Sequence, residues 1–257
     1  GFASDIDMII RTAHDNNIPV VVDESHGSHY AFAPEIMPVP ALSAGADVVI
    51  HSAHKTLPVL TQGAFLHISK SFTAYSNSAD DVFRNSLKAV STSSPSFLIA
   101  ATLDYARTLM AAKGRKLSHD LYGSVSAFVR SLRPALADCF SLSSPADSAF
   151  VMYAPFRLCF TPGNAFINIK EIYDKMTKSG IFPEFADLTD IVMICKFTNT
   201  SDDFINLADI LVSSYNEVLS DADKQKDNAD DFRKRAMLKE KIKSIMELSC
   251  STVISPG

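Results

Sequence analysis

Two short runs rich in β-branched residues restrict the fold of this chain more than any other feature. Residues 18–25 read IPVVVDES and residues 47–52 read DVVIHS, and such continuous apolar runs are typical of strands covered on both faces. Between them, PVPALSAGA at residues 38–46 predicts a short helix that ends at a glycine. Strand, helix and strand in this order predict a βαβ unit with parallel strands, whose carboxyl ends lie at one edge of the sheet.

The segments around this unit predict further helices and strands. Ile6, Ile9, Ile10 and Ala13 have helical spacing, and Ser4 is the predicted N-cap of their helix. The other expected elements are a return strand at 63–69, helices over 78–121 interrupted by STSSPS, strands at 156–160 and 191–197, and helices at 168–180 and 202–219.

Charge and cysteine content exclude several classes of protein. The net charge is −5, and a nucleic-acid surface needs clustered basic residues, so we expect no nucleic-acid partner. The four cysteines have neither CxxC nor Cys/His ligand spacing, which predicts a reduced intracellular protein without a metal site. No apolar run is long enough to span a membrane, so we expect the cytoplasm, or an organelle such as a plastid.

A carboxylate and an amine follow the two predicted parallel strands. Asp23 ends the first strand, and Lys55 stands just past the second, in HSAHKT. A partly desolvated lysine can form a Schiff base with an aldehyde, and a carboxylate suits a basic ring nitrogen. Pyridoxal phosphate has both groups. Either residue alone is ordinarily structural, a solvated lysine or a capping aspartate, but the combination favours a cofactor site.

These residues resemble the large domain of the Orn/Lys/Arg decarboxylases, pyridoxal-phosphate enzymes of fold type I. The stretches VVVDESHGSHYAF and HSAHKTLPVLTQ are similar to the family pattern D-E-A-H-G-A-H followed by S-T-H-K-x-L-P-A-x-T-Q. STSSPSFLIAATLDYAR, APFRLCFTPG and IVMICKFTNTSDDFINLADIL are similar to later parts of the family. The resemblance covers roughly residues 1–218.

The resemblance implies an α/β fold: part of an aspartate-aminotransferase-like large domain with a mostly parallel sheet, followed by a small α+β domain. We assign residues 1–115 to the carboxyl-terminal portion of the large domain and residues 116–218 to the small domain. Residues 219–257 are a charged tail that we expect to be helical or partly disordered.

The family's roles can be carried over to several residues of this chain. Lys55 would be the Schiff-base lysine, Asp23 the partner of the pyridine nitrogen, and His26 a contact of the ring or its phenolic oxygen. Ser25 replaces the family alanine and should pack against the ring face. The residues expected near phosphate groups are Ser52 and His54 in the same subunit, and Thr92 and Ser93 toward a neighbouring subunit.

The remaining histidines are expected to have structural roles. His51 and His67 adjoin strands and are interpreted either as buried residues satisfied by their neighbours or as residues that support the site without touching a ligand. His14 and His119 are interpreted as structural. His29 either lines the crevice or caps the turn.

The function implied is pyridoxal-phosphate-dependent decarboxylation of a cationic amino acid (lysine, arginine or ornithine) by a homodimer or higher oligomer, giving a polyamine-type amine. The family segments that anchor the phosphate and stack on the ring are not found, so the chain is interpreted as truncated at both ends. We therefore expect weak cofactor binding and slow or absent turnover. The alternatives are a non-catalytic paralogue that acts through dimerisation, and another fold-type-I enzyme such as an acyltransferase.

Overall fold

The chain forms two compact units. The computed structural model describes residues 2–70, 72, 79–136, 140–142, 152–162 and 167–224. One unit consists chiefly of residues 2–120 and the other chiefly of residues 121–257. The division falls within helix α5 (Phe97–Leu136), and the predicted boundary after residue 115 stays a prediction.

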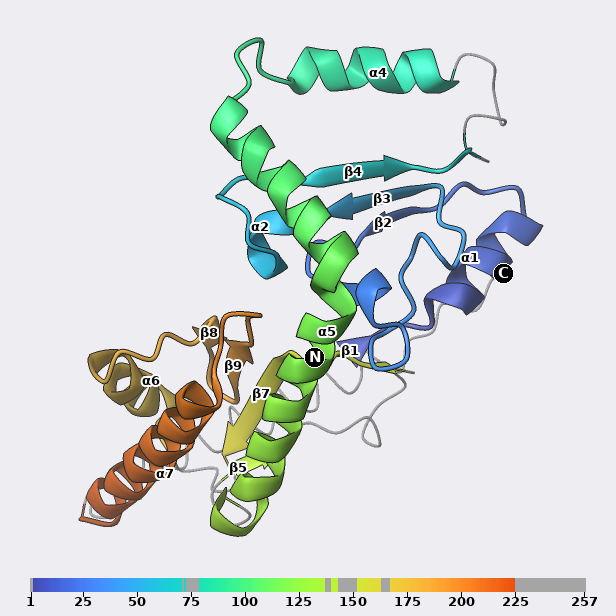
Figure 1. Cartoon of the computed structure of the whole chain (residues 1–257). Helices are drawn as coiled ribbons and strands as arrows, with labels where there is room; N and C mark the ends of the chain where they lie inside the picture. Colours follow the sequence, from blue (N-terminus) through green and yellow to red (C-terminus); the bar gives the residue numbers. More distant parts are fainter. Residues whose placement is uncertain are drawn as a thin grey trace. The chain divides into compact units, whose positions relative to one another are not determined.

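The first unit contains a three-stranded sheet in the order β2–β3–β4 (Figure 1). Its strands are β2 (Val21–Asp23), β3 (Val48–His51) and β4 (Phe65–Ile68). β2 and β3 are parallel, with Asp23 opposite Ile50, whereas β3 and β4 are antiparallel. The predicted parallel pair and the predicted return strand are confirmed.

β2 differs from the strand that its sequence predicts. It is one of the two outer strands of the described sheet, and Val21 is 60% exposed. The expectation of a strand covered on both faces is therefore wrong for β2. It holds better for β3, where Val48 and Val49 are fully buried and Ile50 is partly exposed.

The connection between β2 and β3 contains no α-helix, which corrects the predicted helix at residues 38–46. A single 3-10 turn, η1 (Tyr30–Phe32), is followed by irregular chain and turns. Pro38 and Pro40 disfavour the helical conformation in the residue before each of them, and Gly45 ends the segment, so only a single turn fits between, in which Ala44 N donates to Pro40 O at 3.0 Å. Gly45 has the expected stop conformation, with φ of 96°.

Helix α1 (Ile6–Asp15) precedes β2 in the chain and packs against this sheet. Ile10 is buried in a core cluster with Ala41, Ala46 and Val49, as its helical spacing indicates. The N-cap is Asp5, whose side chain accepts a hydrogen bond from Met8 N at 3.0 Å, so the prediction of Ser4 is wrong by one residue. Both residue types are good N-caps, and the sequence pattern does not separate neighbouring positions.

Asp47 joins α1 to the sheet. Its fully buried carboxylate lies 2.9 Å from His14 Nε2 and accepts a hydrogen bond from Val20 N at 2.7 Å. Replacing Asp47 with alanine leaves both partners without this acceptor, so we expect the free energy of unfolding to fall by about 1–3 kcal/mol. Urea denaturation measures the change. The control is Asp104→Ala, which removes an exposed ion pair to Arg107 and should change stability by less than about 0.5 kcal/mol.

The rest of the first unit is mostly helical. Its further elements are α2 (Ala53–Thr56), α4 (Ala79–Val90), the amino-terminal part of α5, and a small antiparallel pair of β1 (Phe2–Ala3) with β6 (Met152–Tyr153). Gly114 of α5 lies against Phe32 of η1, where an added Cβ would stand 2.8 Å from the ring. The two helices predicted around STSSPS are confirmed as α4 and α5.

The second unit is built on a four-stranded antiparallel sheet in the order β5–β7–β9–β8. Its elements are β5 (Phe140–Leu142), β7 (Arg157–Pro162), α6 (Ile169–Lys178), β8 (Phe185–Ala186), β9 (Ile191–Ile194) and α7 (Ser201–Lys224). Phe160, Ile172 and Leu211 are fully buried in its core. The strands and helices predicted between residues 156 and 219 are confirmed.

The tail predicted from residue 219 is described only to the end of α7, and residues 225–257 lie outside the described residues. Among the helices of the described ranges, none combines the length and the apolar composition that a bilayer-spanning segment needs.

Candidate active site

The carboxyl ends of β2 and β3 bring Asp23 toward the segment that contains Lys55. Asp23 is the last residue of β2, and Ser52 joins β3 to α2, in which Lys55 lies. The Lys55 amine lies 3.4 Å from His26 Nε2. The structure therefore brings Asp23, His26 and Lys55 to one edge of the sheet, as two parallel strand ends require.

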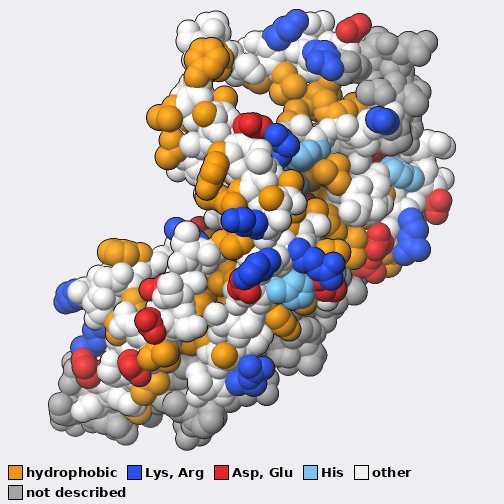
Figure 2. All heavy atoms as spheres, in the orientation of Figure 1, with side chains coloured by type: hydrophobic (Ala, Val, Ile, Leu, Met, Phe, Trp, Pro, Cys, Tyr) orange, Lys and Arg blue, Asp and Glu red, His pale blue; other side chains and the backbone are white. Residues whose placement is uncertain are grey.

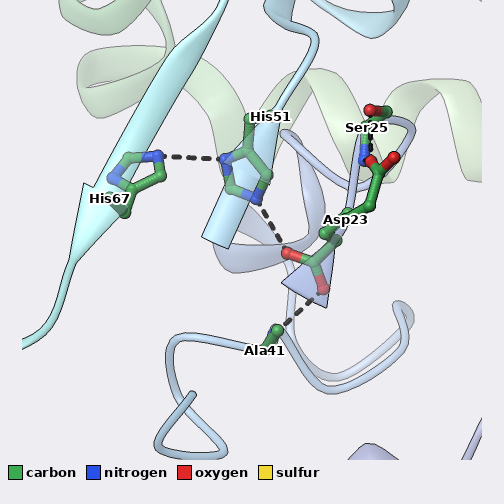
Figure 3. A network of polar contacts seen from close by, with 6 residues as sticks. Asp23, Ser25, Ala41, His51 and His67 are labelled. Atoms are coloured by element: carbon green, nitrogen blue, oxygen red, sulfur yellow. Dashed lines mark hydrogen bonds and ion pairs between the residues drawn. The ribbon is translucent and has the colours of Figure 1, made fainter. Parts of the chain in front are cut away.

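The carboxylate of Asp23 is held in its ionised form. Its Oδ1 accepts hydrogen bonds from the hydroxyl of Ser25 and from Ser25 N, the latter at 3.0 Å (Figure 3). These bonds, with a smaller contribution from the positive charge of Lys55, lower the pKa of Asp23. The side chain is exposed, so its second oxygen can meet a ligand.

The other predicted site residues at these strand ends differ in the contacts that their side chains make. Ser25 donates its hydroxyl to Asp23, and its expected contact with a ring face stays a prediction. Ser52 is the N-cap of α2, and its side chain makes no capping hydrogen bond. The half-buried His54 uses Nδ1 to reach Gly63 O at 3.0 Å, which leaves Nε2 for any other partner. The phosphate roles of Ser52 and His54 stay predictions.

Thr92 and Ser93 lie apart from these residues in the chain between α4 and α5. Both are exposed, and Thr92 Oγ1 accepts a hydrogen bond from Ser94 N at 3.1 Å. No hydrogen bond recorded among the described residues joins either of them to Asp23 or Lys55. Their predicted contact with the site of a second subunit therefore stays a prediction.

A buried polar network lies behind the site. Glu24, His51 and His67 are linked by hydrogen bonds, and His51 reaches the other two through its two ring nitrogens. The sequence interpretation of His51 as a satisfied buried histidine agrees with this geometry, whereas His67 is half-buried, and no role was assigned to Glu24. The signal for Glu24 was present, because it directly follows Asp23 and points to the opposite side of the chain in an extended segment.

His29 is the most deeply buried histidine near the site. It is 6% exposed, and its ring stands edge-on to Tyr30. Burial, with smaller contributions from His51 and His26, lowers the pKa of His29 to about 4. The imidazole is therefore neutral at physiological pH, and it belongs to the protein interior rather than to an exposed turn.

The residues at this sheet edge fit the chemistry of pyridoxal phosphate. An ionised carboxylate and an amine stand at the ends of neighbouring parallel strands. In addition, the buried hydroxyls of Ser28 and Thr56 have no hydrogen-bond partner among the described residues, whereas buried polar groups ordinarily have one. No cluster of histidine, cysteine or acidic side chains in the described ranges could hold a metal ion.

The fold of this chain is shared by lysine decarboxylases and by an aminotransferase of known structure, and its sheet edge carries a lysine and an aspartate. A family model described as Orn/Lys/Arg decarboxylase, major domain, matches residues 1–179, and the chain belongs to this family.

Known proteins similar to this chain agree with that membership. An arginine decarboxylase of Bacillus subtilis is 29% identical over 228 residues, which are 88% of this chain and 44% of that protein. The uncharacterised Bacillus subtilis protein YaaO is 44% identical over 107 residues, which are 42% of this chain and 21% of that protein. Lysine decarboxylase A from Pseudomonas aeruginosa has the same fold, with a TM-score of 0.69 at 16% identity over 83% of this chain and 35% of that one. The chain spans less than half the length of each.

Proposed function

We propose that this chain carries the cofactor-binding lysine of a pyridoxal-phosphate-dependent decarboxylase that acts on a basic amino acid, arginine, lysine or ornithine. The observation that supports it most is the meeting of Lys55, His26 and Asp23 at one sheet edge. Membership of the Orn/Lys/Arg decarboxylase family supports decarboxylation as the reaction, and the relative named arginine decarboxylase favours a basic substrate.

Each of these side chains has a role that follows from its chemistry. When bound, pyridoxal phosphate supplies an aldehyde for the lysine and a ring that withdraws electrons from the bond to the leaving carboxylate. Lys55 is the nucleophile toward the aldehyde. Asp23, which its lowered pKa keeps anionic, would stabilise a proton on the ring nitrogen. His26, within 3.4 Å of the Lys55 amine, can exchange a proton with it.

We propose further that the chain acts as a homodimer. Exposed apolar side chains occur on α4 and on the amino-terminal part of α5, and Figure 2 shows hydrophobic side chains at the upper left, over the start of α5. Val90 is 84% exposed and Phe97 is 85% exposed, which is unusual for large apolar residues. Thr92 and Ser93 lie between them, so a second subunit covering this surface would also receive these two hydroxyls.

An assay for product separates the proposal from its alternatives. The purified chain is mixed with pyridoxal phosphate and divided into portions. Arginine, lysine, ornithine and the neutral control norleucine are each added to a separate portion. Mass spectrometry then measures the amines. We expect the amine of at least one basic amino acid, formed slowly, and none from norleucine. Condensation with acetyl-CoA, added in a parallel reaction, would instead identify an acyltransferase, and dimerisation without any product would identify a non-catalytic paralogue.

A further inference from the structure

Glu24 holds the end of β2 against β3. Its side chain is 11% exposed, whereas that of its neighbour Asp23 is exposed. Glu24 N donates to Ile50 O at 3.0 Å, and Glu24 Oε1 accepts from Ala41 N at 2.9 Å. An added Cβ on Gly27 would stand 2.4 Å from Glu24 Cγ, so the carboxylate side chain lies closely against the turn that follows. Glu24 is thus fixed on several sides.

His51 connects Glu24 to the next strand. Its Nε2 lies 2.8 Å from Glu24 Oε2, and its Nδ1 lies 3.1 Å from His67 Nε2. The rings of His51 and His67 meet edge to face, with centroids 4.8 Å apart (Figure 3). His51 is 8% exposed, so water does not replace these bonds readily. The three side chains form a relay from β4 through β3 to the end of β2.

The chemistry of the groups determines where the protons lie. A carboxylate only accepts hydrogen bonds, so His51 must donate from Nε2 to Glu24. A neutral His51 then accepts at Nδ1, and His67 must donate from Nε2. With both imidazoles neutral, these hydrogen bonds hold each ring as its Nε2–H tautomer.

The relay connects the two segments that carry the candidate active site. Glu24 is one residue after Asp23 and two residues before His26, while His51 is four residues before Lys55. The Glu24–His51 bond therefore crosses between the two strand ends directly behind Asp23 and Lys55.

We propose that Glu24 and His51, with His67 fixing the tautomer of His51, are positioning residues that hold Asp23 and His26 in register with Lys55. This inference rests on the proposed cofactor site and goes beyond it, since none of the three side chains is needed as a contact of the ligand. A purely structural pair would affect stability and leave the geometry of the site unchanged.

The sharpest test is Glu24→Gln, which keeps size and one acceptor while replacing the other oxygen with an amide donor. The amide then donates to His51 Nε2, so His51 must donate from Nδ1 to His67, and both rings change to their Nδ1–H tautomers. Long-range proton–nitrogen NMR spectra of the cofactor-free chain report the tautomers directly. We expect Nε2–H for both histidines in the wild type and Nδ1–H for both in the variant.

A second pair of variants tests positioning. His51→Ala removes the bridge, and we expect pyridoxal phosphate, followed by absorbance titration, to bind about tenfold more weakly. His51→Gln can again donate to Glu24 and accept from His67, and should regain most of the affinity. His119→Gln is the control, because His119 is an exposed histidine paired with Glu35 and should change nothing at the site. Each variant is first checked by its proton spectrum for a folded core.

The outcomes separate this inference from the proposed function. If the wild type takes up no pyridoxal phosphate, the proposed function fails, and positioning is then judged from the His26 ring signals of the cofactor-free chain. These signals should shift in His51→Ala and not in His119→Gln. Unshifted His26 signals, Nδ1–H tautomers in the wild type, or an unchanged affinity in His51→Ala would each overturn the positioning role.

Discussion

Lys55→Ala abolishes the covalent attachment of pyridoxal phosphate and lowers any decarboxylation by about a thousandfold or more. The reason is that the amine of Lys55 is the nucleophile that the proposed site offers to the aldehyde, and alanine has no group that can replace it. The measurement is reduction with borohydride in the presence of the cofactor, followed by peptide mass spectrometry. The wild type should carry the reduced cofactor on the peptide that contains Lys55.

The control for this prediction is Lys70→Ala. Lys70 is an exposed lysine in the same unit that follows β4, and its removal should leave the labelled peptide unchanged. Cofactor found on other lysines in equal yield, or a visible absorbance band that persists in Lys55→Ala, contradicts the assignment of Lys55.

The second large effect is a loss of stability in mild acid that depends on His29. Its pKa is lowered from 6.5 to about 4 by burial, so between these values the unfolded chain binds a proton that the folded chain does not. Above pH 6.5 both states are neutral at this residue, and His29 contributes nothing to the pH dependence. As the pH falls from 6.5 to 4, the free energy of unfolding should decrease by about 3 kcal/mol from this residue alone.

Urea denaturation at several values between pH 7 and pH 4.5 checks this prediction. His29→Gln removes the titrating group, so its stability should decline less steeply over the window, even if the variant is less stable at pH 7. The pKa of His67 is also lowered, but His67 is present in both proteins, so its contribution to the pH dependence cancels in the comparison. His119→Gln, altered at an exposed position, should follow the wild type. Equal slopes for wild type and His29→Gln would refute the role of His29.

The sequence allowed the elements that carry the site to be predicted, because their signals are local. The β-branched run at β3 and the helical spacing around Ile10 correspond directly to observed elements. Asp23 and Lys55 could be paired since parallel strands place their carboxyl ends together, whatever the length of the connection. The proline-rich connection was predicted less well, because a pattern of apolar residues indicated a helix that Pro38 and Pro40 prevent.

The relay of Glu24, His51 and His67 could not be predicted for a different physical reason. Its contacts depend on the register of β3 against β4, in which His67 pairs with Val49 and so comes next to His51. Register is set by packing and by turn geometry over the whole hairpin, and the sequence of either strand alone does not contain it. The burial of His29 is likewise a property of the completed interior.

The position of β2 at the outside of the described sheet has a practical consequence. Val21 of β2 is exposed, and the side of β2 that faces away from β3 has no backbone partner among the described residues. Such a strand can recruit a strand from another molecule and so begin aggregation. Because Asp23 ends the same strand, association of this kind would bring another molecule close to Asp23, and preparations at low protein concentration would limit it.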